Sequence, residues 1–168
     1  MPNLHKPFRI NVGFIVHADI GYAHEIPFEL EKAVLGEDFI LENFDGSVNV
    51  GRTPQGLVVQ GSFSGDTSLQ CMRCLNEFNY RLNWELTELY AFSKNSVSES
   101  GLLLPDSAQI DLAPLLREYA LLEVPIKPIH SPDCKGLCIE CGQDLNEIDC
   151  GHDQGHDNSP FSVLKNLL

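Results

Sequence analysis

Two Cys-x-x-Cys pairs constrain this chain more than any other feature of its sequence. The pairs are Cys71/Cys74 and Cys138/Cys141, and the other cysteines are Cys134 and Cys150. Two thiolates separated by two residues, presented by one tight turn, can bind the same metal ion. One such pair is weak evidence. Two pairs with further Cys and His residues beside them are typical of zinc sites. In a reducing compartment, such cysteines are more often metal ligands than disulfide partners.

The composition indicates a globular chain with an acidic surface. Its 168 residues, 43% of them hydrophobic, fit one compact core with a small appendage. No apolar run approaches the roughly 20 residues of a membrane span, and no secretory signal pattern is visible, so we expect a cytoplasmic protein. The net charge is −13 and the basic residues are scattered. Broad nucleic-acid binding is therefore unfavourable, and a basic protein partner fits better.

Hydrophobic patterning predicts an α+β fold, mainly antiparallel β with one packed helix and a C-terminal zinc-knuckle lobe. The clearest strand is 78–92, where seven of eight even-numbered residues are apolar. Thr53–Gly56 has the Pro and Gly positions of a hairpin turn, and 57–70 is the returning strand. Cys71 and Cys74 are thus expected at the tip of a second hairpin. Further short strands are expected at 39–41 and 46–52, whereas 8–30 suggests a strand and a turn without secure boundaries.

The helix is expected at about 111–123. Asp111 can cap its N-terminus, Pro114 is tolerated in the first turn and Pro125 ends it. Its leucines share one face, so the helix should lie on the sheet. We expect 1–128 to form the antiparallel β-rich domain. Residues 129–168 are expected to form a Cys/His-rich zinc-binding tail, because its cysteine-rich part has too few large apolar residues for a core of its own. A short C-terminal helix is expected at 161–168.

Eight Cys and His residues fit two closed tetrahedral zinc sites. The preferred partition has one site of Cys71, Cys74, His130 and Cys134, and a second of Cys138, Cys141, Cys150 and either His152 or His156. An alternative joins both Cys-x-x-Cys pairs in one four-cysteine site and leaves Cys134 and Cys150 free. The sequence therefore predicts one or two structural Zn²⁺ ions.

Catalytic motifs are missing from the sequence. No histidine has Glu at the second following position, as a zinc deaminase requires, and His24-Glu25 is not followed by His at position 28, as in a helical zinc protease. A redox role for Cys71 and Cys74 needs a helix N-terminus in a βαβ unit, whereas strands flank this pair. We expect no enzyme and no small-molecule substrate. A thiol-based redox enzyme or sensor, or a zinc-buffering protein, is the alternative.

Several short motifs stand in a fixed order along the chain. They are Cys71–Leu75 (Cys-x-Arg-Cys-Leu), Ile110–Leu112, Val124-Pro125 to Pro128, Asp133–Cys138, Cys141-Gly142, Leu145-Asn146 and Phe161–Leu168. This combination resembles the YceD family, the former DUF177 group of large ribosomal RNA subunit accumulation proteins. Members of that family carry cysteines where this chain has His130 and His152, an exchange that preserves zinc ligation.

The resemblance implies a role in accumulation or processing of the large-subunit ribosomal RNA, and hence in ribosome assembly. The expected partner is the large-subunit precursor, or a basic ribosomal protein or assembly factor, which the acidic charge favours over broad RNA contact. Local RNA contact near Arg73 and Arg81 is left open.

Overall fold

The computed structural model describes residues 7–152, which divide into two compact units. The sheet unit comprises residues 7–68 and 79–125, and the cysteine lobe comprises residues 69–78 and 126–152. The tip of the second hairpin thus belongs with the segment that follows the helix. His156 and the helix expected at 161–168 lie outside the described residues. No described helix is long and apolar enough to cross a membrane.

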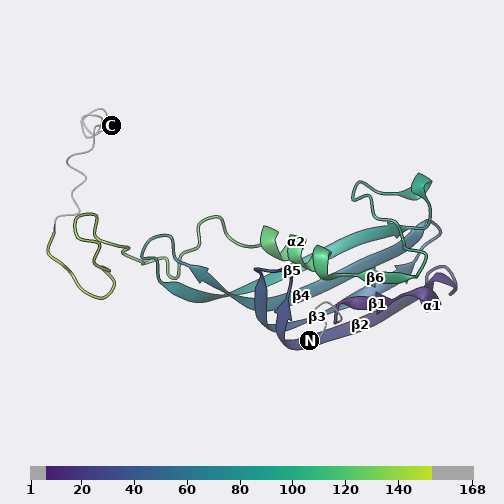
Figure 1. The fold of residues 1–168 in the computed structure, drawn as a ribbon, viewed down its shortest axis with the longest axis horizontal. Helices are drawn as coiled ribbons and strands as arrows, with labels where there is room; N and C mark the ends of the chain where they lie inside the picture. The colour runs from purple at the N-terminus through teal and green to yellow at the C-terminus, as the bar shows by residue number, and fades with distance from the viewer. Residues whose placement is uncertain (1–6, 153–168) are drawn as a thin grey trace. The chain divides into compact units, whose positions relative to one another are not determined.

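A four-stranded sheet in the order β2-β3-β4-β5 is the frame of the sheet unit (Figure 1). Its strands are β2 (Ala23–Val34), β3 (Ile40–Arg52), β4 (Gly56–Gln70) and β5 (Glu77–Ala91). The pairs β2–β3 and β3–β4 are antiparallel. In β5, Leu82, Trp84 and Leu86 are buried and the odd-numbered residues between them are exposed, which confirms the predicted alternation.

The β3–β4 connection is the predicted hairpin turn. The backbone N–H and the hydroxyl of Thr53 both donate to the carbonyl of Gly56 at 2.9 Å. The prediction of two short strands before this turn was wrong, because β3 is a single strand. Its pairing with β4 shifts register between Glu42 and Asp45, and Asn43 adopts a left-handed φ of 49°. This irregularity interrupts the side-chain alternation that would have identified one continuous strand.

Several short elements lie outside the four-stranded sheet. β1 (Arg9–Asn11) pairs antiparallel with β6 (Gln109–Asp111), and three short helical segments accompany them, namely α1 (Gly13–Val16), η1 (Lys94–Ser96) and α2 (Ala113–Leu122). Of these elements, β1, α1, β6 and α2 contribute residues to the core of the sheet. The carboxylate of Asp111 accepts a hydrogen bond from the N–H of Ala113 at 3.0 Å. Leu115, Leu116 and Ala120 of α2 join the buried core of the sheet, which confirms that the helix lies on it.

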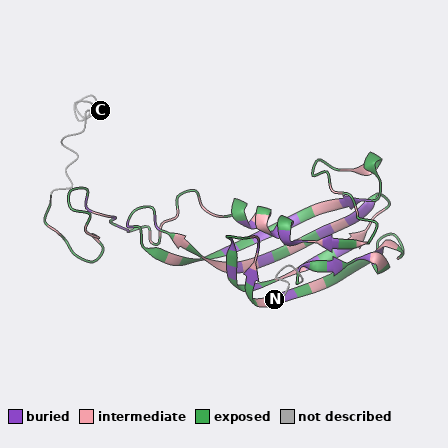
Figure 2. Ribbon diagram, in the orientation of Figure 1, coloured by how far each residue is buried: buried purple, intermediate pink, exposed green. Residues whose placement is uncertain are grey.

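Phe44 lies among the aromatic rings of this core. Its ring centroid is 5.4 Å from that of Phe8, 5.7 Å from that of Phe63 and 6.0 Å from that of Trp84. Figure 2 shows buried residues recurring along the strands and on α2. The sheet unit therefore has a continuous apolar core and does not depend on a metal ion for its packing.

Tyr90 gives the sheet unit a specific dependence on alkaline pH. Burial raises the pKa of Tyr90 to about 12, and the carboxylates of Glu88 and Asp111 contribute to the rise. A raised pKa contributes stability that is complete below the ordinary value of 10.0 and is lost as the pH rises through about 12. Over this rise in pH, we expect the unfolding free energy of the parent protein to fall by about 2–3 kcal/mol more than that of the Tyr90→Phe variant.

Urea titrations between pH 10 and 12 would measure this loss. Tyr22→Phe is the matched control, because the Tyr22 side chain is exposed. If Tyr90→Phe and the parent protein lose stability at the same rate over this range, Tyr90 is not the responsible group.

Candidate metal centre

The first Cys/His set consists of Cys71, Cys74, His130 and Cys134, and it lies entirely within the cysteine lobe. Cys71 and Cys74 come from the turn between β4 and β5, whereas His130 and Cys134 come from the segment after α2. All four ligand atoms lie within 4.8 Å of one another. Cys71, Cys74 and Cys134 are buried, and His130 is exposed. The structure thus brings together the four side chains of the first predicted site.

Distances within this set match those of a tetrahedral zinc site. The Sγ atoms of Cys71 and Cys134 are 3.8 Å apart, and the Sγ of Cys74 is 3.4 Å from Nδ1 of His130. Two sulfur atoms that bind one tetrahedral zinc at about 2.3 Å lie about 3.8 Å apart, and a sulfur and a nitrogen lie slightly closer. Three thiols and one imidazole are also a donor set that zinc prefers. The set could therefore hold Zn²⁺.

The thiols of this set differ in how readily they ionise. Burial raises the pKa of Cys74 to about 11, and the neighbouring Cys71 and Cys134 thiols add to the rise. Burial also opposes ionisation of Cys71, but hydrogen bonds from the backbone of Cys74 and from His130 lower the pKa of Cys71 to about 5. One thiolate therefore forms readily, while a second needs a compensating positive charge.

The second Cys/His set consists of Cys138, Cys141, Cys150 and His152. Nδ1 of His152 is 3.8 Å from Sγ of Cys138 and 3.3 Å from Sγ of Cys150, and the four ligand atoms lie within 4.8 Å of one another. A backbone hydrogen bond from His152 lowers the pKa of Cys150, but the Cys138 and Cys141 thiols and burial outweigh it, so this pKa is raised. The two Cys-x-x-Cys pairs thus fall into separate sets, as in the preferred partition.

The two Cys-x-x-Cys turns, hereafter the first and second knuckle, share one backbone framework. In the first, the N–H of Leu75 donates to the carbonyl of Cys71 at 2.9 Å, and the N–H of Cys71 donates to Asn76 at 2.9 Å. In the second, the N–H of Gly142 donates to Cys138 at 2.9 Å, and the N–H of Cys138 donates to Gln143 at 2.8 Å. Leu75 and Gly142 therefore occupy equivalent positions.

Sequence reasoning did not identify the groups that support the first set. The guanidinium of Arg73 donates to the carbonyls of Pro132 at 3.2 Å and Cys134 at 2.9 Å. The side-chain amide of Asn146 donates to the sulfur of Cys134 at 3.5 Å, and its oxygen accepts from the N–H of Lys135 at 2.9 Å. Such second-layer contacts orient metal ligands. The only sequence signal for Asn146 was its place in the Leu145-Asn146 motif.

The two arginines that were candidates for RNA contact are both engaged within the protein. Arg73 binds the two carbonyls just described, and Arg81 forms ion pairs with Asp45 and Asp66. A hydrogen bond from Asn43 lowers the pKa of Asp66 against the opposing effect of burial, and Arg81 lowers it further. Both guanidinium groups thus already have carbonyl or carboxylate partners, and local RNA contact near them stays a prediction.

The cysteine lobe has very little apolar core. Its buried cluster consists of Cys71, Cys74 and Cys134, packed against the partly buried Phe78, Ile129 and Leu137. Gly136 approaches the first knuckle so closely that a Cβ there would meet the carbonyl oxygen of Arg73 at 3.1 Å, and its φ is 78°. This cluster and the buried Cys138 are little apolar surface for a lobe of this size, so an ion held by either Cys/His set would add to its stability.

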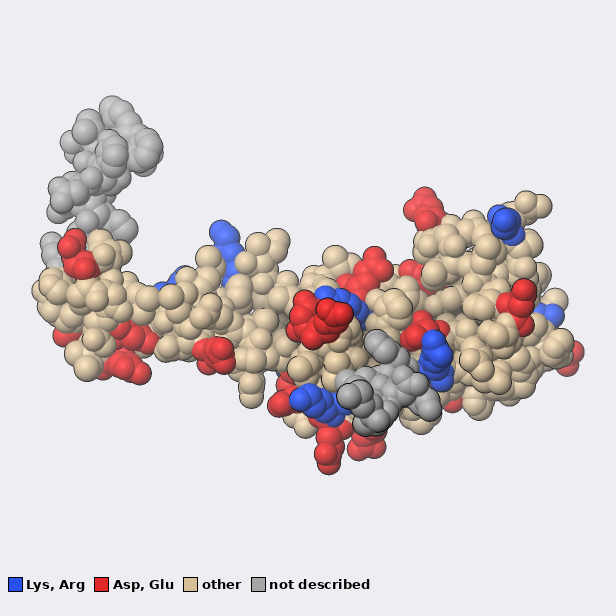
Figure 3. Space-filling view, in the orientation of Figure 1, with Lys and Arg blue, Asp and Glu red and all other residues tan. Residues whose placement is uncertain are grey.

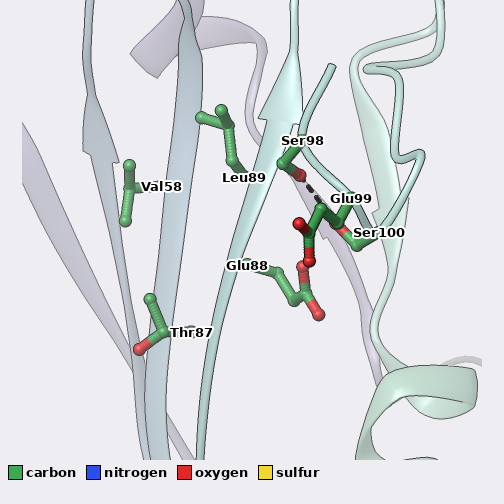
Figure 4. Close-up of a pocket in the computed structure, with 7 residues that line it drawn as sticks. All are labelled: Val58, Thr87, Glu88, Leu89, Ser98, Glu99 and Ser100. Carbon is green, nitrogen blue, oxygen red and sulfur yellow. Dashed lines mark hydrogen bonds between the residues drawn. The ribbon is translucent and has the colours of Figure 1, made fainter.

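A surface cavity of 430 Å³ on the sheet unit is a poorer candidate site (Figure 4). It is lined by Val58, Thr87, Glu88, Leu89, Ser98, Glu99 and Ser100. The hydroxyls of Ser98 and Ser100 are hydrogen-bonded to each other at 2.8 Å, and Glu88 accepts a hydrogen bond from Tyr119 at 2.9 Å. The lining residues include no His, Cys, Lys or Arg, so the cavity lacks the pairing of a nucleophile with an imidazole or amine base.

The chain thus combines an antiparallel sheet and one packed helix with a lobe whose two Cys/His sets could hold metal ions. Residues 59–168 match the family described as "Large ribosomal RNA subunit accumulation protein YceD". The chain belongs to the YceD family, as its motifs indicated.

Several curated proteins are similar to this chain. Proteins described as uncharacterized, from Mycobacterium tuberculosis and Mycobacterium bovis, are 32% identical over 107 residues, which is 60% of this chain and 51% of theirs. An Arabidopsis thaliana protein named "Large ribosomal RNA subunit accumulation protein YCED homolog 1, chloroplastic" is 36% identical over 63 residues, 38% of this chain and 20% of its own. The chain spans about half the length of the mycobacterial relatives. No solved structure matches it.

Proposed function

We propose that this protein is a zinc-stabilised, non-catalytic factor for accumulation or processing of the large-subunit ribosomal RNA, and hence for assembly of the large ribosomal subunit in the cytoplasm. The observation that carries the proposal is the YceD match, which covers both Cys/His sets and most of β4 and β5. The description of the family names an accumulation protein. The geometry suggests the mechanism: bound ions would order the cysteine lobe, and the ordered lobe would present a docking surface to a partner.

Each set is proposed to hold one structural Zn²⁺. The residues that would bind the ions are Cys71, Cys74, His130 and Cys134 in the first set, and Cys138, Cys141, Cys150 and His152 in the second. Each set supplies four donors, so neither leaves an open coordination position for substrate or water, as a catalytic zinc does. This full complement of protein donors favours a structural role.

A thiol-based redox enzyme or sensor is the competing function. The pKa of Cys71, at about 5, fits a reactive thiol, but reactive cysteines are partly exposed and the Cys71 side chain is fully buried. A zinc-buffering protein needs exposed, exchangeable ligands, and the first set has three buried thiols. Burial of the first set therefore favours the assembly factor.

Native mass spectrometry of the purified chain is expected to show two zinc ions, one for each set. Tagged protein is expected to co-sediment with precursor large-subunit particles, and its deletion is expected to change the amount of precursor ribosomal RNA. One ion would contradict the two-site arrangement, and a metal-free chain that is ordered throughout residues 69–78 and 126–152 would contradict the structural role. Unchanged precursor RNA in the deletion strain would contradict the function.

A further inference from the structure

Leu75 does not fit the local preference of its position in the first knuckle. It is equivalent to Gly142 in the second knuckle, and both residues adopt a left-handed backbone, with φ of 62° for Leu75 and 74° for Gly142. Glycine adopts this conformation freely, whereas a Cβ crowds the following backbone. Because the chain uses glycine at this position in one knuckle, the leucine in the other is held against a conformational cost.

Packing inside the lobe does not account for this leucine. Among the described residues, Leu75 belongs neither to the buried cluster of the lobe nor to the side chains that pack against this cluster. Its side chain is 54% exposed, and that of Met72, within the same knuckle, is 51% exposed. Strained residues persist where function requires them, and neighbouring exposed apolar side chains mark contact surfaces. The first knuckle therefore presents two large apolar side chains to a partner.

The charges of the cysteine lobe indicate the chemistry of that partner. Its described residues include six carboxylates, Glu77, Asp133, Glu140, Asp144, Glu147 and Asp149, against the three basic residues Arg73, Lys127 and Lys135. Figure 3 shows acidic side chains on the visible face of this lobe, at the left. Three thiolates and one imidazole around a divalent cation, as proposed for each set, add one further negative charge per site. Such a surface repels phosphate and complements a cationic protein segment.

We propose that Met72 and Leu75 are the apolar anchor by which the cysteine lobe docks a protein segment rich in Lys and Arg that also carries apolar side chains. The apolar side chains of that segment cover the first knuckle, and its cations face the carboxylates of the lobe. This docking site rests on the proposed function, since the large-subunit precursor supplies the segment. A direct contact between the knuckle and RNA is the competing outcome.

Leu75→Gly tests this anchor, because it removes the side chain and the backbone strain together. The variant is expected to keep the zinc content of the parent and to have an equal or higher midpoint of thermal unfolding. Its binding to the basic proteins extracted from large ribosomal subunits is expected to weaken by about tenfold or more, which is what burial of one leucine contributes. Leu75→Asn, which also tolerates a left-handed backbone, provides a second variant with the same expected loss.

Ile139→Ala in the second knuckle is the matched control, because Ile139 is 72% exposed and lies between Cys138 and Cys141 as Met72 lies between Cys71 and Cys74. Its binding is expected to equal that of the parent. Protein-free large-subunit RNA is the second probe, and binding to it that depends on Leu75 would overturn the protein partner. If the parent binds extracted proteins and Leu75→Gly binds equally well, the anchor is wrong. If the parent binds neither probe nor precursor particles, the proposed function itself fails.

Discussion

Removing the metal ions is expected to disorder the cysteine lobe and to leave the sheet unit folded. The described part of the lobe has four buried thiols, three of them packed against three half-buried apolar side chains, whereas the sheet unit has a continuous apolar core. Structural zinc binding supplies on the order of 10 kcal/mol of folding free energy in small metal domains. Its loss therefore removes most of what orders residues 69–78 and 126–152.

Hydrogen exchange before and after chelation measures this effect at individual amides. The N–H groups of Cys71, Met72 and Cys138 are hydrogen-bonded to backbone carbonyls and are expected to lose protection. The paired amides of β3 and β4 are expected to stay protected. Cys71→Ser is expected to release one of two ions and to expose the same region, while Met72→Ala in the same turn keeps both. A metal-free lobe with unchanged protection would show that the ions do not hold it.

Phe44→Ala is expected to destabilise the sheet unit by about 3–5 kcal/mol, the cost of truncating a phenylalanine in a well-packed core. Phe44 is 1% exposed and contacts the rings of Phe8, Phe63 and Trp84. A loss of this size is a large part of the roughly 5–15 kcal/mol by which domains are stable. Denaturant unfolding can be followed by fluorescence of Trp84, the single tryptophan.

Phe14→Ala is the matched control for this core substitution. Phe14 is 51% exposed, and its ring makes an edge-to-face contact with the ring of His24. Its truncation is expected to cost less than about 1 kcal/mol. Equal losses in the two variants would mean that the aromatic cluster around Phe44 is not the centre of the core.

The parts of the fold that the sequence predicted are those with local signals. The alternation of β5, the Pro-Gly turn before β4 and the proline-bounded helix α2 each depend on residues close together in the chain. The β1–β6 pair has no such signal. Its strands have only three residues each, and they are far apart in the sequence, since Arg9 pairs with Asp111. β2 is an edge strand of its sheet, and its mostly exposed side chains obscure any apolar pattern.

The candidate site divides in the same way. Spacing alone suggested which Cys and His residues belong together, and the structure gathers them in those two sets, although their binding of an ion stays a prediction. The supporting contacts could not be predicted, because they join distant residues. Asn76 donates to Asp144 at 2.7 Å across 68 positions of sequence, and Arg73 reaches Cys134 across 61. Nothing in the composition of either segment specifies such a pairing.

The separation of the first set along the chain decides when each proposed metal site could be completed in a nascent polypeptide. Cys71 and Cys134 are 63 residues apart, and β5, β6 and α2 all lie between them. During translation, Cys71 and Cys74 therefore leave the exit tunnel first. The other two residues of the set, His130 and Cys134, follow only after β5, β6 and α2 have been synthesised. The second set needs only residues 138–152 and is completed last. If both sets bind ions as proposed, vectorial synthesis would complete the first site before the second.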